Sequence, residues 1–135
     1  TTLFRSDDKL WIGTYAGGLN VLDTKTGLFR VYNSVNSDPK TLDGGSIYAI
    51  YKDRNNRMWV ATMSGVNLYN RATDDFTRVK QFNATTIDIV QDQKGWIWFV
   101  TIGKGVFRLN PQTNKWVNYN TSHGNKSALP SNVSN

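Results

Sequence analysis

The side chains suited to catalysis are few in this chain, and their spacing is poor for it. His123 is the single histidine, lies in a polar tail, and belongs to a chain that has no cysteine. With no carboxylate near it, His123 completes neither a metal site nor a catalytic triad. The pairs Asp7–Asp8 and Asp74–Asp75 fit turns, whereas glycosidic cleavage needs an acid of raised pKa across the sugar from its partner. We therefore predict that the chain is not an enzyme and that His123 is a solvated loop residue.

Motifs that would hold a metal ion or a phosphate are missing from the sequence. The glycine pairs Gly17–Gly18 and Gly44–Gly45 lack the spacing of a phosphate-binding loop. The run Asp53–Asn56 begins like a calcium loop, but it continues to Arg57 without the glycine and glutamate that such a loop requires. Because there is no cysteine, thiolate ligands and disulfides are excluded as well. We predict no metal ion and no other cofactor.

The net charge of +6, from 16 basic and 10 acidic residues, favours a polyanionic partner such as nucleic acid, an acidic glycan or anionic lipid. The basic residues are spread from Arg5 to Lys126 without a block, so most of them are expected to serve solubility. No nucleic-acid-binding module is recognisable, which argues against a nucleic-acid partner. No apolar run approaches ~18 residues, so we expect no membrane-spanning segment, and the N-terminus does not have the order of a signal peptide.

The elements that must position any site are predicted to be strands. The chain has no glutamate, and its ten acidic residues are all aspartates, alongside 15 asparagines and 17 aromatic residues. Asparagine, aspartate and glycine favour turns, aromatic residues favour strands, and long helices usually contain Ala, Leu, Glu and Lys. This composition predicts an all-β fold.

A sequence repeat predicts the order of these strands. Three segments align on a tryptophan, and each is followed by a glycine and a second apolar segment: Leu10–Thr14, Met58–Thr62 and Ile97–Thr101. The tryptophans are 48 and 39 residues apart. An aspartate stands six residues before the second and the third tryptophan, where the first has Arg5. Four short strands recurring at roughly 40–48 residues are typical of a β-propeller blade.

The repeat predicts about three four-stranded antiparallel blades, in units 1–46, 47–85 and 86–135. Strand A of the first unit is expected to be only a stub at residues 1–5, and residues 129–133 are expected to lead into a fourth strand A. A propeller closes with about four to eight blades, so three blades form an open arc. We therefore expect either an open fragment of a larger propeller or copies that assemble into a ring. The glycines after the tryptophans (Gly18, Gly65 and Gly105) are expected to allow a positive φ or a close backbone approach.

The runs Leu10–Asn20 and Ile47–Val60 strongly resemble the regulator-propeller repeat of two-component systems. The resemblance covers essentially the whole chain. It implies the periplasmic sensor region of a hybrid histidine kinase and response regulator of Bacteroides-type bacteria, which forms homodimers and is anchored by a membrane helix. Members of this family sense oligosaccharides from plant or host polysaccharides and switch on the genes that degrade them.

Ligand recognition is expected on the loops at one face of the propeller. In propellers the bends between strands B and C and the connections between blades open on the same face, and such loops commonly carry binding residues. The variable residues at the bends are the candidate ligand-binding residues Tyr15, Met63, Ile102 and Lys104. Tyr15 can stack on a sugar ring, and Lys104 can pair with an acidic sugar. Three further lysines lie on the connections: Lys40, Lys80 and Lys126.

Two functions remain open from the sequence. In the first, the chain is a ligand-sensing segment that binds an oligosaccharide, which the basic charge weakly tilts toward an acidic one. In the second, the blades only build the ring and a contact between proteins, without a ligand site of their own. Nucleic-acid binding and a lyase-type propeller enzyme are less well supported. Substitution of Tyr15 and Lys104 would abolish a ligand response under the first function and change nothing under the second.

Overall fold

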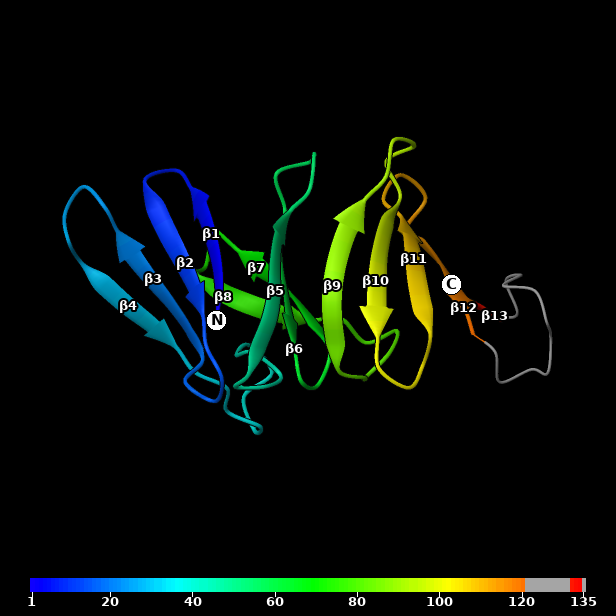
Figure 1. Ribbon diagram of the computed structural model, residues 1–135, viewed down its shortest axis with the longest axis horizontal. Coiled ribbons are helices and arrows are strands. Elements are labelled where there is room, and N and C mark those ends of the chain that lie inside the picture. Colours follow the sequence, from blue (N-terminus) through cyan, green and yellow to red (C-terminus); the bar gives the residue numbers. More distant parts are fainter. Residues whose placement is uncertain (121–131, 135) are drawn as a thin grey trace.

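The computed structural model describes residues 1–120 and 132–134, and in these residues the regular structure consists of β-strands alone (Figure 1). The strands form three antiparallel sheets that follow one another along the chain, and within each sheet consecutive strands are neighbours. The predicted all-β fold of four-stranded propeller blades is therefore confirmed. Within the described part of the chain, no helix is long and apolar enough to cross a membrane.

The first sheet has a complete first strand, which the sequence analysis missed. Its strands are β1 (Thr2–Ser6), β2 (Lys9–Gly13), β3 (Leu19–Asp23) and β4 (Phe29–Tyr32). Residues 1–5 were expected to be a stub, but β1 pairs with β2 over its whole length. The two strands are joined by Asp7 and Asp8, whose φ angles are 54° and 59°. Positive φ at both central residues is the geometry of a tight two-residue hairpin, and aspartate tolerates it.

The second and third sheets repeat this arrangement. The second contains β5 (Ile47–Lys52), β6 (Met58–Thr62), β7 (Val66–Asn70) and β8 (Asp75–Arg78). The third contains β9 (Thr86–Gln91), β10 (Ile97–Thr101), β11 (Val106–Asn110), β12 (Lys115–Tyr119) and β13 (Asn132–Ser134). Figure 1 shows the second sheet between the other two, with β1, β5 and β9 as the first strand of each sheet. The unit boundaries at residues 46 and 85 stay a prediction.

Residues 129–133 were expected to lead into the first strand of a further sheet. The strand β13 belongs to the third sheet instead. It pairs antiparallel with β12, from Trp116 opposite Ser134 to Asn118 opposite Asn132, and so adds a fifth strand at the edge of the third sheet. The outer edge of β12 offers unpaired N–H and C=O groups, and an antiparallel strand can satisfy them. The sequence pattern predicts a strand in this region, but it does not show which neighbouring strand will pair with it.

The apolar core lies between neighbouring sheets. One cluster joins Trp11, Leu19 and Val21 of the first sheet to buried side chains of the second: Ile47, Ile50, Met58, Val60 and Phe76. The other joins Trp59, Ala61 and Val66 of the second sheet to buried side chains of the third: Ile89, Ile97, Phe99, Phe107, Leu109 and Trp116. All five residues of β6 are buried, because the middle sheet is covered on both faces. Each of the first two tryptophans therefore faces the sheet that follows it in the chain.

The bends after β2 and β10 depend on glycine, as predicted. Gly18 and Gly105 have φ angles of 75° and 76°, and a Cβ at either would lie within 2.4 Å of a backbone oxygen. Gly65 differs, because its φ is not in the left-handed region. A Cβ at Gly65 would instead lie 2.6 Å from a carboxylate oxygen of Asp43. Both expected reasons for glycine therefore apply at Gly18 and Gly105, whereas only the close approach of another group applies at Gly65.

Candidate functional site

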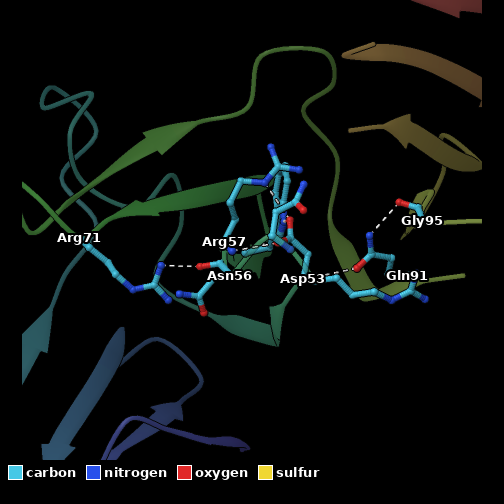
Figure 2. Close-up of polar contacts among 9 residues, drawn as sticks. Asp53, Asn56, Arg57, Arg71, Gln91 and Gly95 are labelled. Atoms are coloured by element: carbon cyan, nitrogen blue, oxygen red, sulfur yellow. Dashed lines mark hydrogen bonds and ion pairs between the residues drawn. The ribbon is translucent and has the colours of Figure 1, made fainter. Parts of the chain in front are cut away.

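At one end of the second sheet, Asp53 organises the turn between β5 and β6 (Figure 2). Its side chain accepts hydrogen bonds from the backbone N–H groups of Asn55 and Arg57, each at 2.9 Å. It also accepts from Arg57 Nε at 2.9 Å and from the indole Nε1 of Trp59 at 2.8 Å. Asp53 is only 4% exposed. Because both of its carboxylate oxygens are engaged in these bonds, Asp53 stabilises the turn.

The third sheet repeats this arrangement, and the first does not. Asp92 accepts from the indole Nε1 of Trp98 at 2.8 Å, and this bond together with backbone N–H groups holds the pKa of Asp92 below its usual range, against the effect of burial. In the first sheet the turn is shorter, so Ser6 and not Arg5 takes the position of the aspartate. The side chain six residues before the tryptophan therefore accepts this indole hydrogen bond in the second and third sheets only.

The turns at this end also tie the second sheet to the third. The side-chain oxygen of Gln91 accepts from the backbone N–H of Arg54 at 2.8 Å, and its amide nitrogen donates to the carbonyl of Gly95 at 2.8 Å. Arg71 donates to the carbonyl of Asn56 (Figure 2). Because these polar groups are already hydrogen-bonded within the protein, they are not free to bind a ligand at this end of the sheets.

At the opposite end, two residues join the three bends into one continuous rim. Ser46 accepts from the N–H of Ala16 through its hydroxyl at 3.0 Å, and from the N–H of Met63 through its carbonyl at 3.1 Å. Thr85 donates its hydroxyl to the carbonyl of Met63 at 2.7 Å and accepts from the N–H of Ile102 at 2.8 Å. Ser46 and Thr85 lie at or just before the first strands of their sheets. The sequence analysis missed both, because small polar residues before a strand are common in any loop.

Three of the four predicted site residues occupy one equivalent position on this rim. Tyr15, Met63 and Ile102 each follow the tryptophan of their unit by four residues, and they are 73%, 50% and 61% exposed. The ring of Tyr15 packs edge-on against Tyr48, with centroids 5.7 Å apart. The fourth residue, Lys104, is exposed, and its Nζ lies 3.3 Å from the side-chain oxygen of Asn83.

Two pockets beside the rim share the residues Asp43 and Ser64. The first has a volume of about 440 Å³ and is lined by these two and by Ala16, Gly18, Asn33, Ser34, Asn36, Gly44, Gly45 and Met63. The second has a volume of about 480 Å³ and is lined by the shared pair and by Arg78, Val79, Lys80, Gln81, Phe82, Asn83, Lys104 and Phe107. Tyr15 and Ile102 line neither. Lys40 lies in a separate hollow along β8, and Lys126 and His123 lie outside the described residues.

Asp43 forms the partition between the two pockets. Its Oδ1 accepts from the hydroxyl of Thr62 at 2.5 Å and from the side-chain amide of Asn67 at 2.9 Å, and both of these partners are fully buried. The partition is thus anchored in the middle sheet. No sequence signal marked Asp43, because a single aspartate before a glycine pair is typical of a turn.

Arg78 lines the second pocket, but its guanidinium is already engaged. It donates to the backbone carbonyls of Val35, Asp38, Thr41 and Leu42 at 2.9–3.2 Å. These bonds fix the connection between the first and second sheets, which lines much of the first pocket and contributes Asp43 to the second. Lys80 and Lys104 are therefore the cations of the second pocket that face solvent.

A second polar cluster bridges the first two sheets near the turn between β7 and β8. Asp74 accepts from the hydroxyls of Tyr32 and Tyr69, each at 2.6 Å, and from Arg30. Burial opposes ionisation of Asp74, but the hydrogen bonds from both tyrosines and the charge of Arg30 outweigh it, so its pKa lies below its usual value. Burial and the bond to Asp74 raise the pKa of Tyr32.

The aspartate pair in this cluster has the wrong electrostatics for a general acid. Hydrogen bonds from Thr73 and Asn70 also hold the pKa of Asp75 below its usual value. A glycosidase acid needs a raised pKa, and the pKa of both Asp74 and Asp75 is lowered. Across residues 1–120, no group of three or more histidine, aspartate or glutamate side chains is arranged to hold a metal ion.

Comparison with known proteins supports the propeller fold. Residues 41–64 match the family model for the two component regulator propeller, which confirms the resemblance within this segment. The extracellular domain described as that of the hybrid two component system BT3049 from B. thetaiotaomicron aligns with a TM-score of 0.75 and 20% identity over 87% of the chain. The extracellular domain described as that of the one component system BT4673 from the same organism aligns with a TM-score of 0.72 and 19% identity over 85% of the chain.

The alignments cover a small part of these structures. The chain corresponds to 18% of the BT3049 domain and 17% of the BT4673 domain. No curated protein matches the chain. The likeness to the solved structures therefore concerns the fold.

Proposed function

We propose that this chain is a ligand-binding segment of the periplasmic sensor region of a hybrid two-component system. Its ligand is an oligosaccharide held at the rim, and binding is signalled to a histidine kinase in a homodimeric protein. The observation that carries the proposal is the pair of pockets that share Asp43 and Ser64 beside the joined bends. The match to the two component regulator propeller at residues 41–64 supports the sensor context.

The chemistry of the second pocket favours an acidic oligosaccharide. Gln81 and Asn83 offer planar amides that can bond to sugar hydroxyls, and Lys80 and Lys104 offer exposed ammonium groups for a carboxylate. The side chain of Arg78, which lines this pocket, is held by backbone carbonyls, so a ligand meets a side chain that needs little rearrangement. Tyr15 lies outside both pockets on the same rim, where its exposed ring can stack on a further sugar unit.

One observation favours the alternative, a segment that only builds the ring and contacts other proteins. The N–H groups of Ala16, Met63 and Ile102 at the bends are already bonded to Ser46 and Thr85. The bends therefore offer a ligand side chains but few backbone donors. Under this alternative the exposed apolar side chains of Met63 and Ile102 contact protein.

The two functions are distinguished by titrating trigalacturonate and neutral maltotriose into the chain by calorimetry. We expect trigalacturonate to bind, and Lys104→Ala and Lys80→Ala each to weaken its binding by roughly 10–100-fold, since one lost charge-assisted bond is worth about 1.5–3 kcal/mol. Lys94→Ala is the matched control, because Lys94 is exposed in the turn between β9 and β10, at the other end of the sheet. Absence of binding by both sugars, or equal loss in the control, would contradict the proposed site.

A further inference from the structure

The two pockets beside the rim differ in charge. The lining of the second contains the three cations Arg78, Lys80 and Lys104, whereas the lining of the first contains no lysine or arginine. Within the described part of the chain, none of these cations forms an ion pair with a carboxylate. The acidic residue of both linings is the shared Asp43. The second pocket therefore carries positive charge, and the first carries negative charge.

The ammonium groups of the second pocket can receive an anion. Lys104 Nζ lies 3.3 Å from the side-chain oxygen of Asn83, a neutral acceptor that leaves the charge of Lys104 uncompensated. Lys80 is exposed on the wall of the same pocket. A hydrogen bond between an ammonium group and a carboxylate is roughly twice as strong as one between neutral groups. The second pocket therefore suits a uronate unit, a sugar that carries a carboxylate.

The first pocket offers neutral polar side chains in place of cations. Asn33, Ser34 and Asn36 line it from the connection between the first two sheets. Amides and hydroxyls both donate and accept hydrogen bonds, as the hydroxyls of a sugar do. The exposed side chain of Met63 adds an apolar surface for the C–H groups of a sugar ring. This lining suits a neutral sugar unit and holds no cation for a carboxylate.

The carboxylate of Asp43 stands where a ligand passes from one pocket to the other. Its Oδ1 is engaged by Thr62 and Asn67, and its backbone N–H donates to the side-chain oxygen of Asn67 at 3.1 Å. These bonds hold the side chain in place. Among the residues that the structure describes, Oδ2 accepts no hydrogen bond, so it is free to accept one from a sugar hydroxyl.

The same carboxylate disfavours a second negative charge. Two unit charges of like sign at about 4 Å repel each other even in water, and more strongly at a protein surface, which corresponds to about tenfold in affinity. In the second pocket this repulsion is outweighed by the cations. In the first pocket no cation of the lining offsets it.

We propose that the oligosaccharide is mixed in charge, with a uronate unit in the second pocket and a neutral unit next to it in the first. This inference rests on the proposed function and names the class of its ligand. Asp43 accepts a hydrogen bond from a hydroxyl of the neutral unit and repels a carboxylate at that place. It is thus the residue that selects a mixed oligosaccharide over a uniformly acidic one, by attraction and repulsion together.

Four disaccharides with one sugar scaffold test this selection by calorimetry. They are digalacturonate, its two derivatives in which one carboxylate is reduced to the alcohol, and the doubly reduced neutral form. We expect one singly reduced derivative to bind about tenfold more tightly than digalacturonate, and the neutral form to bind most weakly. If digalacturonate or the neutral form binds as tightly as both mixed forms, the inference is wrong and the proposed function stands. Absence of binding by all four contradicts both.

Two variants test the charge of the first pocket. Asp43→Asn removes the charge and keeps the size of the side chain, and we expect digalacturonate to bind about tenfold more tightly to it than to the wild type. Asn36→Lys adds a cation at an exposed position of the first pocket and leaves the buried bonds of Asp43 intact, so the same gain is expected. Circular dichroism checks that each variant is folded.

Asn55→Lys is the matched control for the added charge. Asn55 is exposed in the turn between β5 and β6, at the opposite end of the second sheet, and lines neither pocket. We expect its affinity for digalacturonate to equal that of the wild type. An equal gain in this control, or no gain in Asn36→Lys, would overturn the assignment of the neutral unit to the first pocket.

Discussion

The indole Nε1 of Trp59 donates to Oδ2 of Asp53, six residues earlier, at 2.8 Å. The same relationship joins Trp98 to Asp92 in the third sheet. Asp53 is buried and also pairs with Arg57, whereas Asp92 is partly exposed and has no such ion-pair partner in the described structure. The aspartate six residues before the tryptophan is therefore expected to contribute differently to stability in the two sheets.

Asp53→Ala is therefore expected to destabilise the protein more than Asp92→Ala. Removal of Asp53 leaves Trp59 Nε1 and Arg57 without their acceptor, which costs about 3 kcal/mol, since buried donors lose charge-assisted bonds. Asp92→Ala is expected to cost about 1 kcal/mol, because water can replace part of its bonding. Urea unfolding of both variants measures the difference, and equal losses would contradict the role of burial.

The bends give a prediction that isolates steric conflict from backbone strain. Gly103 and Gly105 both have positive φ, 91° and 76°, but a Cβ at Gly103 meets nothing within 4 Å. A Cβ at Gly105 would lie 2.2 Å from the carbonyl oxygen of Tyr119. Gly103→Ala is expected to cost about 1–2 kcal/mol from the left-handed conformation alone. Gly105→Ala is expected to cost clearly more in thermal and urea unfolding, and similar values would show that the bend relaxes.

Arg78 is expected to control the order of the connection between the first two sheets. Arg78→Lys keeps the charge but loses the planar group that reaches several carbonyls at once, so the connection loses most of its anchoring bonds. We expect faster proteolysis within residues 33–43, located by mass spectrometry, and a loss of about 2 kcal/mol in stability. Arg71→Lys is the control, since its contact is to a single carbonyl, that of Asn56. Equal protease resistance of both variants would contradict this role.

The Asp74 cluster predicts acid sensitivity with a defined sign. Its pKa in the folded protein lies below the ordinary 3.8, so the unfolded chain binds the proton more readily. The stability that Asp74 contributes is present above that ordinary value and is lost as the pH falls through the lower, folded pKa.

Removing the two hydroxyl donors tests this sign. Tyr32→Phe combined with Tyr69→Phe is expected to bring the pKa of Asp74 back toward its ordinary value, and so to flatten the fall in stability below about pH 4. Urea midpoints measured between pH 2 and pH 6 provide the slope. Tyr119→Phe, on the third sheet, should leave it unchanged. An unaltered slope in the double variant would exclude Asp74 as its source.

The sequence predicted the fold well because the repeat is a periodic signal. The tryptophans, the glycines after them and the aromatic residues at the start of each fourth strand mark equivalent positions in all three sheets. Two errors arose from features that the repeat does not encode, namely the length of one turn and the pairing at one sheet edge. The short turn at Asp7 and Asp8 shifted the register by one residue, and β13 found an open edge at β12.

The candidate site was less predictable, because it depends on contacts between distant loops. Tyr15, Met63 and Ile102 could be located by alignment of the repeat, and the structure places all three on the rim. Asp43, Ser46, Arg78 and Thr85 could not, since their partners are 17 to 43 residues away along the chain and carry no motif. Whether the four predicted residues bind a ligand stays a prediction.

The placement of the core between sheets has a consequence for how the molecule comes apart. Each apolar cluster joins one sheet to its neighbour, so stability is close to a sum of nearest-neighbour terms. An outer sheet can open by breaking one cluster, whereas the middle sheet must break both. The outer sheets are therefore expected to unfold locally more often than the middle sheet. The backbone amides of β6 are expected to be the last to exchange their hydrogens with water.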